Sequence, residues 1–259
     1  MKIRCMILAL FILLCFPLRT VEAESAAETF NQVKGSLTVI WAVHKVSSVT
    51  GIDLAKTLRI GSGVLISDKG EVMTAAHLVE TADEIRVKLS NGEFVDAHLV
   101  SSALFADIAL LQLESIPRDI SAAKLGDSGK VRVGDEVFVA GAPYGLNHAL
   151  TSGHISARHQ QNIMSGGFEA AEFFQTEAVI NERNSGGPMF NLDGEVIGIV
   201  SHILFTGSFE GLGFAVTSTT AKRLLLGQKS FWLSPEGIQP ADKLSAVFNL
   251  PTSMGVLVQ

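Results

Sequence analysis

The chain has 259 residues, of which 47% are hydrophobic, and a formal net charge of −6. This acidic balance argues against nucleic acid as the main partner, because nucleic-acid-binding surfaces are basic. Both cysteines, Cys5 and Cys15, lie near the N-terminus, so the rest of the chain has neither a disulfide nor a thiolate nucleophile.

The N-terminal segment has the pattern of a targeting peptide. Lys2 and Arg4 give it a positive start, an apolar run extends from 5 to 18, and Val-Glu-Ala at 21–23 is an acceptable cleavage site. The apolar run is short for a membrane-spanning helix, although an uncleaved anchor is the alternative. We therefore expect a signal peptide over residues 1–23, export, and no stable membrane span after cleavage.

After a polar N-terminal segment over residues 24–34, strand signals dominate the chain. These segments are rich in β-branched residues or alternate polar with apolar side chains, and Asn91-Gly92 and Asp193-Gly194 mark tight turns between them. The predicted strands are 36–46, 61–67, 84–90, 93–100, 108–113, 136–143, 173–180, 195–203 and 212–216. Many short strands separated by turns predict an all-β barrel or sandwich.

Only one long helix is predicted in this part of the chain, from Thr219 to Gln228, with Ser218 as its N-cap. The last segment, 229–259, differs because three prolines interrupt it, and it contains a short amphipathic helix at 241–248 and a strand at 255–259. One helix and one strand cannot form a core. We therefore expect 229–259 to be a linker and an incomplete second domain.

Three residues with the chemistry of nucleophilic catalysis lie at the ends of predicted strands. Ser185 lies in the turn NSGGP, His77 ends VMTAAH, and Asp107 begins DIALLQL. A serine hydroxyl is a weak nucleophile until an imidazole accepts its proton, and a carboxylate orients that imidazole. Each residue alone is more often structural. Their order along the chain, however, is that of chymotrypsin-like barrels, and the all-β pattern supports the same fold independently. The alternative is a β-sandwich binding protein in which the order is accidental and the three residues lie far apart.

Longer motifs resemble those of the HtrA/Deg family of exported serine proteases. They are GSGVLIS, VMTAAHLV, DIALLQL, LGDSGKVRVGDEVFVAGAPYGL, TSGHIS, QTEAVINERNSGGP, GEVIGIVSHI and GLGFAV. The resemblance covers roughly residues 30–228. It assigns 35–228 to a trypsin-like serine protease domain, and Trp232-Leu233 and SMGVLV resemble the start of a PDZ domain.

The resemblance implies a chymotrypsin-like double β-barrel with a C-terminal helix and with the active site between the barrels. His77 is then the general base, Asp107 orients its imidazole, and Ser185 attacks the scissile carbonyl. The family also implies a periplasmic or cell-envelope endopeptidase that cleaves misfolded or unfolded envelope proteins, and a homotrimer with Phe30 among its contacts. No spacing of ligating residues indicates a metal site, and no cofactor is expected.

Arg183 departs from the family pattern, which has glycine two residues before the nucleophile. In the family, the N–H groups of this position and of Ser185 form the oxyanion hole. Arginine keeps the N–H, but its Cβ penalises backbone conformations that glycine adopts freely, and loss of one donor costs about 10²–10³ in rate. Two hypotheses therefore stand: an active serine endopeptidase, and a catalytically weakened or silent member that binds peptides or regulates.

Four residues are candidates for the primary specificity pocket: Ile180, Ile199, Val200 and Ser201. The family often has asparagine and threonine at the positions of Val200 and Ser201. An apolar lining would favour small or medium aliphatic residues before the scissile bond. The alternative is that these residues belong to the core of a strand.

Overall fold

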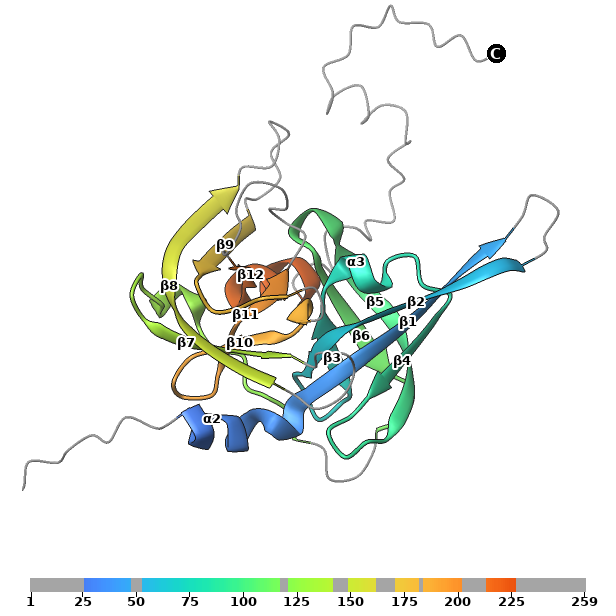
Figure 1. Ribbon diagram of the computed structural model, residues 1–259, viewed down its shortest axis with the longest axis horizontal. Coiled ribbons are helices and arrows are strands. Elements are labelled where there is room, and N and C mark those ends of the chain that lie inside the picture. The colour runs from blue at the N-terminus through green and yellow to red at the C-terminus, as the bar shows by residue number, and fades with distance from the viewer. Residues whose placement is uncertain are drawn as a thin grey trace, which may run out of the picture.

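Two closed antiparallel barrels of six strands each lie side by side (Figure 1). The computed structural model describes residues 26–47, 53–116, 121–141, 149–161, 171–181, 184–201 and 213–226. The first barrel has the strand order β1-β2-β3-β6-β5-β4 and the second has the order β10-β11-β12-β9-β8-β7. The predicted all-β, chymotrypsin-like double barrel is therefore confirmed.

The strands of the first barrel come from the first half of the chain. They are β1 (Leu37–Ser47), β2 (Asp53–Leu65), β3 (Glu71–Thr74), β4 (Glu84–Lys88), β5 (Phe94–Ala103) and β6 (Ile108–Leu113). Along β4, Ile85 and Val87 point into the barrel while Glu84 and Arg86 face solvent, as the alternating sequence predicts. Gly92 has φ 89°, which confirms the predicted turn between β4 and β5.

The second barrel follows in the same antiparallel manner. Its strands are β7 (Glu136–Gly141), β8 (Ala149–Gln161), β9 (Ala171–Thr176), β10 (Pro188–Phe190), β11 (Val196–Ser201) and β12 (Gly213–Thr217). Every residue of the last three strands is buried, which explains why their sequences are nearly continuous apolar runs. Gly194 has φ 70° in the turn between β10 and β11, as predicted.

The cores of the two barrels are joined. One cluster of buried side chains fills the first barrel and another fills the second. A third cluster contains residues of both, among them Val64 and Ile108 from the first barrel and Phe138 and Phe173 from the second. The barrels are therefore packed together through a shared core, and their junction is fixed.

Short helices close the edges of this structure. They are α2 (Ala26–Val33), η1 (Lys34–Ser36), α3 (Ala76–Val79), η2 (Leu104–Ala106), η3 (Ser128–Lys130), α4 (Ser218–Ala221) and the π-helical turn η6 (Lys222–Leu226). Phe30 of α2 packs against the shared core. None of the helices in the described ranges is long and apolar enough to span a membrane.

A helix begins near the predicted position, but its N-cap and its later geometry differ from the prediction. The N-cap is Thr217, whose hydroxyl accepts a hydrogen bond from the Thr220 N–H, whereas the Ser218 hydroxyl donates to the Gly126 carbonyl. Beyond Ala221 the helix continues as the π-helical turn. Residues 1–25 and 227–259 lie outside the described residues, so the signal peptide and the incomplete PDZ domain stay predictions.

The predicted strands differ from the observed ones in several places. The strand predicted over 173–180 ends at Thr176. After it, the Glu177 carboxylate accepts a hydrogen bond from the His154 N–H and the Val179 carbonyl accepts one from the Thr151 hydroxyl, in place of a ladder with β8. The strand β8 was missed altogether, because its polar sequence lacks an apolar alternation. In addition, β2 begins at Asp53, well before the predicted start at Gly61.

Candidate active site

His77 and Asp107 meet because the strands beside them are paired. β3 ends at Thr74, which lies opposite Ala109 of β6. His77 follows β3 within α3, and Asp107 directly precedes β6. The segments after one strand and before its antiparallel neighbour share an edge of the barrel, so the two side chains face each other.

The contact between these two residues is close and buried. The His77 Nδ1 atom lies 2.9 Å from both Asp107 carboxylate oxygens, and the His77 backbone N–H donates to Oδ1 at 2.9 Å. The side chain of Asp107 is 1% exposed and that of His77 is 17% exposed. A carboxylate only accepts hydrogen bonds, so this geometry places a proton on Nδ1 and leaves Nε2 free to accept one.

Asp107 adopts a left-handed backbone conformation, with φ 52° and ψ 46°. Among the described residues it is the only one other than glycine with a positive φ. Aspartate tolerates this region better than most residues. The preceding turn η2 supports the conformation, because the Asp107 N–H donates to the Leu104 carbonyl at 3.1 Å. The backbone turn aims the carboxylate at His77.

Ser201 supplies a second donor to the same carboxylate. Its hydroxyl donates to Asp107 Oδ2 at 2.5 Å, and both side chains are buried. Ser201 ends β11 of the second barrel, whereas Asp107 belongs to the first, so this hydrogen bond crosses the junction. The sequence analysis placed Ser201 in the specificity pocket and missed this contact, because the two residues are 94 positions apart.

Ser185 reaches the junction from the second barrel. Its carbonyl accepts a hydrogen bond from the Ser62 N–H of β2 at 2.9 Å. The next residue, Gly186, has φ 82°, and a Cβ there would lie 2.3 Å from both the Ser62 carbonyl oxygen and Thr74 Oγ1. Only glycine fits this approach. The turn is therefore docked on the strands that lead to His77.

The turn is also tied to the strand that carries Ser201. The Gly186 N–H donates to the Val200 carbonyl at 2.8 Å, and the Val200 N–H donates to the Gly187 carbonyl at 2.9 Å. Ser185 is thus connected to Asp107 through β11 and to His77 through β2 and β3. The two closed barrels exclude the β-sandwich alternative.

Arg59, which the sequence analysis did not single out, supports the histidine. Its Nη1 donates to the His77 carbonyl at 2.5 Å from the exposed part of β2. Glu182 and Arg183 lie outside the described residues. Within the described ranges no group of three acidic, histidine or cysteine side chains could hold a metal ion.

The candidate pocket residues divide into two groups. Ile199 packs in the shared core and Val200 in the core of the second barrel, and both are fully buried, in agreement with the alternative interpretation as core residues. Ile180 is only partly buried. A Cβ on Gly213 would lie 2.4 Å from Ile180 Cδ1, so these two residues are in close contact at the start of β12.

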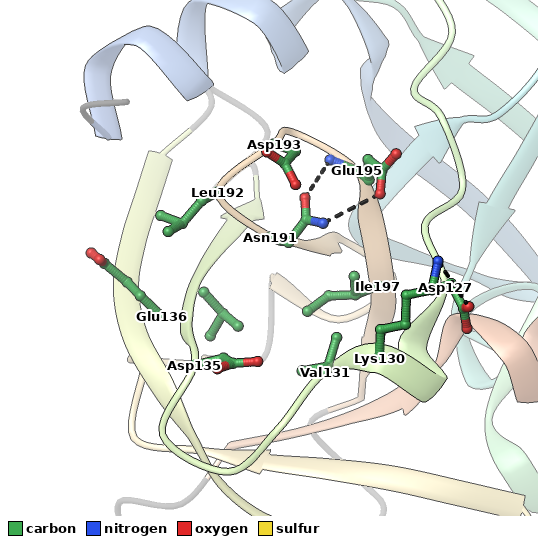
Figure 2. Close-up of a pocket in the computed structure, with 11 residues that line it drawn as sticks. Asp127, Lys130, Val131, Asp135, Glu136, Asn191, Leu192, Asp193, Glu195 and Ile197 are labelled. Carbon is green, nitrogen blue, oxygen red and sulfur yellow. Dashed lines mark hydrogen bonds and ion pairs between the residues drawn. The ribbon is translucent and has the colours of Figure 1, made fainter. Parts of the chain in front are cut away.

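A separate hollow lies at the end of the second barrel (Figure 2). Its walls include Val131, Ile197 and Asn191, and none of the predicted site residues lines it. Three of its carboxylates form ion pairs with neighbouring lysine or arginine side chains: Asp127 with Lys130, Asp135 with Arg132, and Glu195 with Lys124.

Comparisons with known proteins agree with the double-barrel fold. A family model described as a trypsin-like peptidase domain matches residues 61–199. Over 171 residues the chain is 43% identical to the periplasmic serine endoprotease DegP of Escherichia coli K12, a match covering 65% of this chain and 35% of DegP. Over 207 residues it is 38% identical to the periplasmic pH-dependent serine endoprotease DegQ of the same strain, covering 77% of this chain and 45% of DegQ.

A solved structure gives the same result. An HtrA-type protease, a variant of AlgW with a decapeptide, superposes with a TM-score of 0.66 at 27% identity, covering 78% of this chain and 66% of that one. The chain spans less than half the length of DegP and DegQ. The family model matches more than half of the chain and describes a trypsin-like peptidase domain, in agreement with the double barrel. Together with the DegP and DegQ relatives and the HtrA-type neighbour, it shows that the chain belongs to the HtrA/Deg family.

Proposed function

We propose that the chain is a serine endopeptidase in which Ser185 is the nucleophile, His77 the general base and then acid, and Asp107 the residue that orients His77. The observation that carries this proposal is the buried Asp107 carboxylate, which accepts hydrogen bonds from His77 on one side and from Ser201 of the other barrel on the other. Such an arrangement serves a histidine that changes its charge during a reaction.

The chemistry follows from the proton positions. With Nδ1–H held by Asp107, Nε2 of His77 accepts the Ser185 hydroxyl proton as the oxygen attacks the carbonyl carbon of the substrate. The buried carboxylate then stabilises the imidazolium. His77 gives the proton to the leaving amine as the peptide bond breaks. A water molecule then attacks the acyl carbon while His77 accepts its proton, and His77 returns that proton to the Ser185 oxygen as the ester bond breaks and the carboxylic acid leaves. The backbone N–H groups of Ser185 and Arg183 are the proposed donors to the oxyanion.

The proposed substrates are extended segments of misfolded or unfolded proteins in the bacterial envelope. Support comes from the relatives, which are named periplasmic serine endoproteases, and from the neighbour solved with a decapeptide. Removal of residues 1–23 on export, a periplasmic location and a homotrimer complete the proposal. Sedimentation of the secreted protein tests the trimer, and N-terminal sequencing tests cleavage after Ala23.

Ile180 is the proposed wall of the primary specificity pocket. Its side chain lies against Gly213, the first residue of β12, and so occupies space beside the start of that strand. We therefore expect a preference for small or medium aliphatic residues before the scissile bond. A series of peptides that differ only at this residue checks it, with alanine and valine cleaved faster than phenylalanine. Equal cleavage of phenylalanine would contradict it.

Labelling with a fluorophosphonate tests the proposed activity directly. The secreted protein should be labelled and should cleave casein, while Ser185→Ala should lose both properties. Ser90→Ala, at an exposed serine of the first barrel, is the matched control and should behave like the wild type. A folded wild type that shows neither labelling nor cleavage would overturn the proposal.

A second function is kept because Arg183 replaces the usual glycine of the oxyanion hole. In this alternative the chain is a catalytically weakened or silent member that binds peptides or regulates. The substitution Arg183→Gly separates the two. A gain in kcat/KM of about 10²–10³ supports the weakened member, because that is the value of one oxyanion donor. Unchanged kcat/KM shows that arginine is compatible with the active site.

A further inference from the structure

A second histidine–carboxylate pair lies on the surface of the second barrel. His154 of β8 contacts Glu177 twice: its Nδ1 lies 2.7 Å from Oε1, and its backbone N–H donates to the same atom at 2.8 Å. The Ser156 hydroxyl donates to the other oxygen, Oε2, at 2.8 Å. The carboxylate of Glu177 is therefore held by three donors from a single strand.

Glu177 begins the segment 177–181, here called the strap, which runs from β9 toward the nucleophile turn. The strap lies directly on β8. A Cβ on Gly153 would lie 2.6 Å from the Ala178 nitrogen, and the Thr151 hydroxyl donates to the Val179 carbonyl at 3.1 Å. Val179 is largely exposed, whereas Ala178 is buried in the core of the second barrel and Ile180 packs against that core. Apolar packing and these polar contacts together hold the strap.

The other end of the strap contacts the nucleophile turn. The Asn184 N–H donates to the Asn181 carbonyl at 3.0 Å, and Asn184 Nδ2 lies 3.5 Å from the Val179 carbonyl. Asn184 directly precedes Ser185. A displacement of the strap would therefore move the residue that leads into the proposed nucleophile, and small misplacements of reacting groups are costly in rate.

We propose that Glu177 is a positioning residue, which clamps the strap to β8 through His154 and Ser156 and thereby holds Asn184 and Ser185 in place. This inference rests on the proposed function of Ser185. It assigns Glu177 no contact with substrate.

Glu177→Gln tests the clamp by removing the charge at nearly constant size. Its matched control is Glu84→Gln, because Glu84 lies on the first barrel, is similarly exposed and forms an ion pair with Lys45. We expect Glu177→Gln to lower kcat about fivefold to tenfold, with KM changed less than twofold, as the loss of one hydrogen bond to a charged group allows. Glu84→Gln should change neither constant. Ser156→Ala is a milder second variant and should lower kcat in the same direction.

Amide hydrogen exchange gives a readout that does not depend on activity. Exchange in a peptide covering 178–187 should be faster in Glu177→Gln than in the wild type and unchanged in Glu84→Gln, with both variants folded by circular dichroism. Unchanged exchange overturns the clamp. A change in KM alone overturns the positioning of Ser185. If the wild type lacks labelling that depends on Ser185, the proposed protease function fails while hydrogen exchange still decides on the clamp.

Discussion

The described part of the chain contains two histidine–carboxylate pairs of nearly equal length in very different surroundings. Nδ1 of His77 lies 2.9 Å from Asp107, and Nδ1 of His154 lies 2.7 Å from Glu177. Each carboxylate also accepts a serine hydroxyl, from Ser201 and Ser156 respectively. The side chains of the first pair are 17% and 1% exposed, and those of the second are 58% and 49% exposed.

The difference lies in burial and in what the contacts connect. The first pair is desolvated and its hydrogen bonds join two barrels, so each contact is strong and no water replaces a lost one. The second pair lies in water and joins neighbouring segments of one barrel, where screening reduces its strength. Histidine, carboxylate and serine hydroxyl therefore form a strong, buried arrangement at the barrel junction and a weaker, exposed one beside the strap.

The largest contrast is expected when each carboxylate becomes an amide. Asp107→Asn should lower kcat by about 10⁴, because the amide no longer fixes the imidazole with its proton on Nδ1. Glu177→Gln should lose no more than about tenfold. Single-turnover kinetics on both folded variants measures the two values. A loss below tenfold for Asp107→Asn would break the distinction between the pairs.

Alanine at a glycine of the junction tests how tightly the turn is docked. Gly186→Ala should destabilise the protein by about 2–4 kcal/mol and abolish labelling of Ser185, because strain at positive φ adds to overpacking. Gly92→Ala is the control, since its φ is also positive but a Cβ there meets nothing within 4 Å. It should cost only about 1 kcal/mol. Equal losses in urea unfolding would mean that the docking contributes nothing.

The two serines beside the carboxylates allow a closer comparison. Ser201→Ala leaves a buried Asp107 oxygen without its donor from the second barrel and should lower kcat about tenfold to a hundredfold. Ser201→Thr keeps a hydroxyl and should recover most of this loss. The corresponding change in the exposed pair, Ser156→Ala, should cost less than tenfold. Measured kcat values in which Ser156→Ala is the more damaging change would reverse the comparison.

The smallest effect concerns stability in acid. The Ser156 hydroxyl, followed by His154, lowers the pKa of Glu177 from 4.5 to about 2. Because the folded pKa is the lower one, the ionised Glu177 stabilises the fold fully above about pH 4.5, and this advantage disappears as the pH falls toward 2. The Tm of the wild type should exceed that of Glu177→Gln by about 1–2 °C at neutral pH, given the exposure of the pair, and by nothing near pH 2. A difference that stays constant with pH would contradict the role of charge.

The sequence predicted the fold well because the fold depends on local patterns. Alternation along β4 and the turn glycines are visible in a few neighbouring residues, whereas the catalytic roles of His77, Asp107 and Ser185 stay a prediction. The contact between Ser201 and Asp107 was not predictable from local patterns, since it depends on how two barrels pack. Residues 177–180 were predicted as part of a strand because Ala178, Val179 and Ile180 are apolar. In the structure, hydrogen bonds to β8 that involve side chains take the place of a ladder there.

The hydrogen bond from Ser62 to Ser185 ties the proposed activity to the integrity of both barrels. Because the Ser185 carbonyl is held by the barrel to which the serine does not belong, a molecule in which either barrel has opened loses this contact. On the proposed mechanism such a damaged copy is an inert chain rather than an uncontrolled hydrolase.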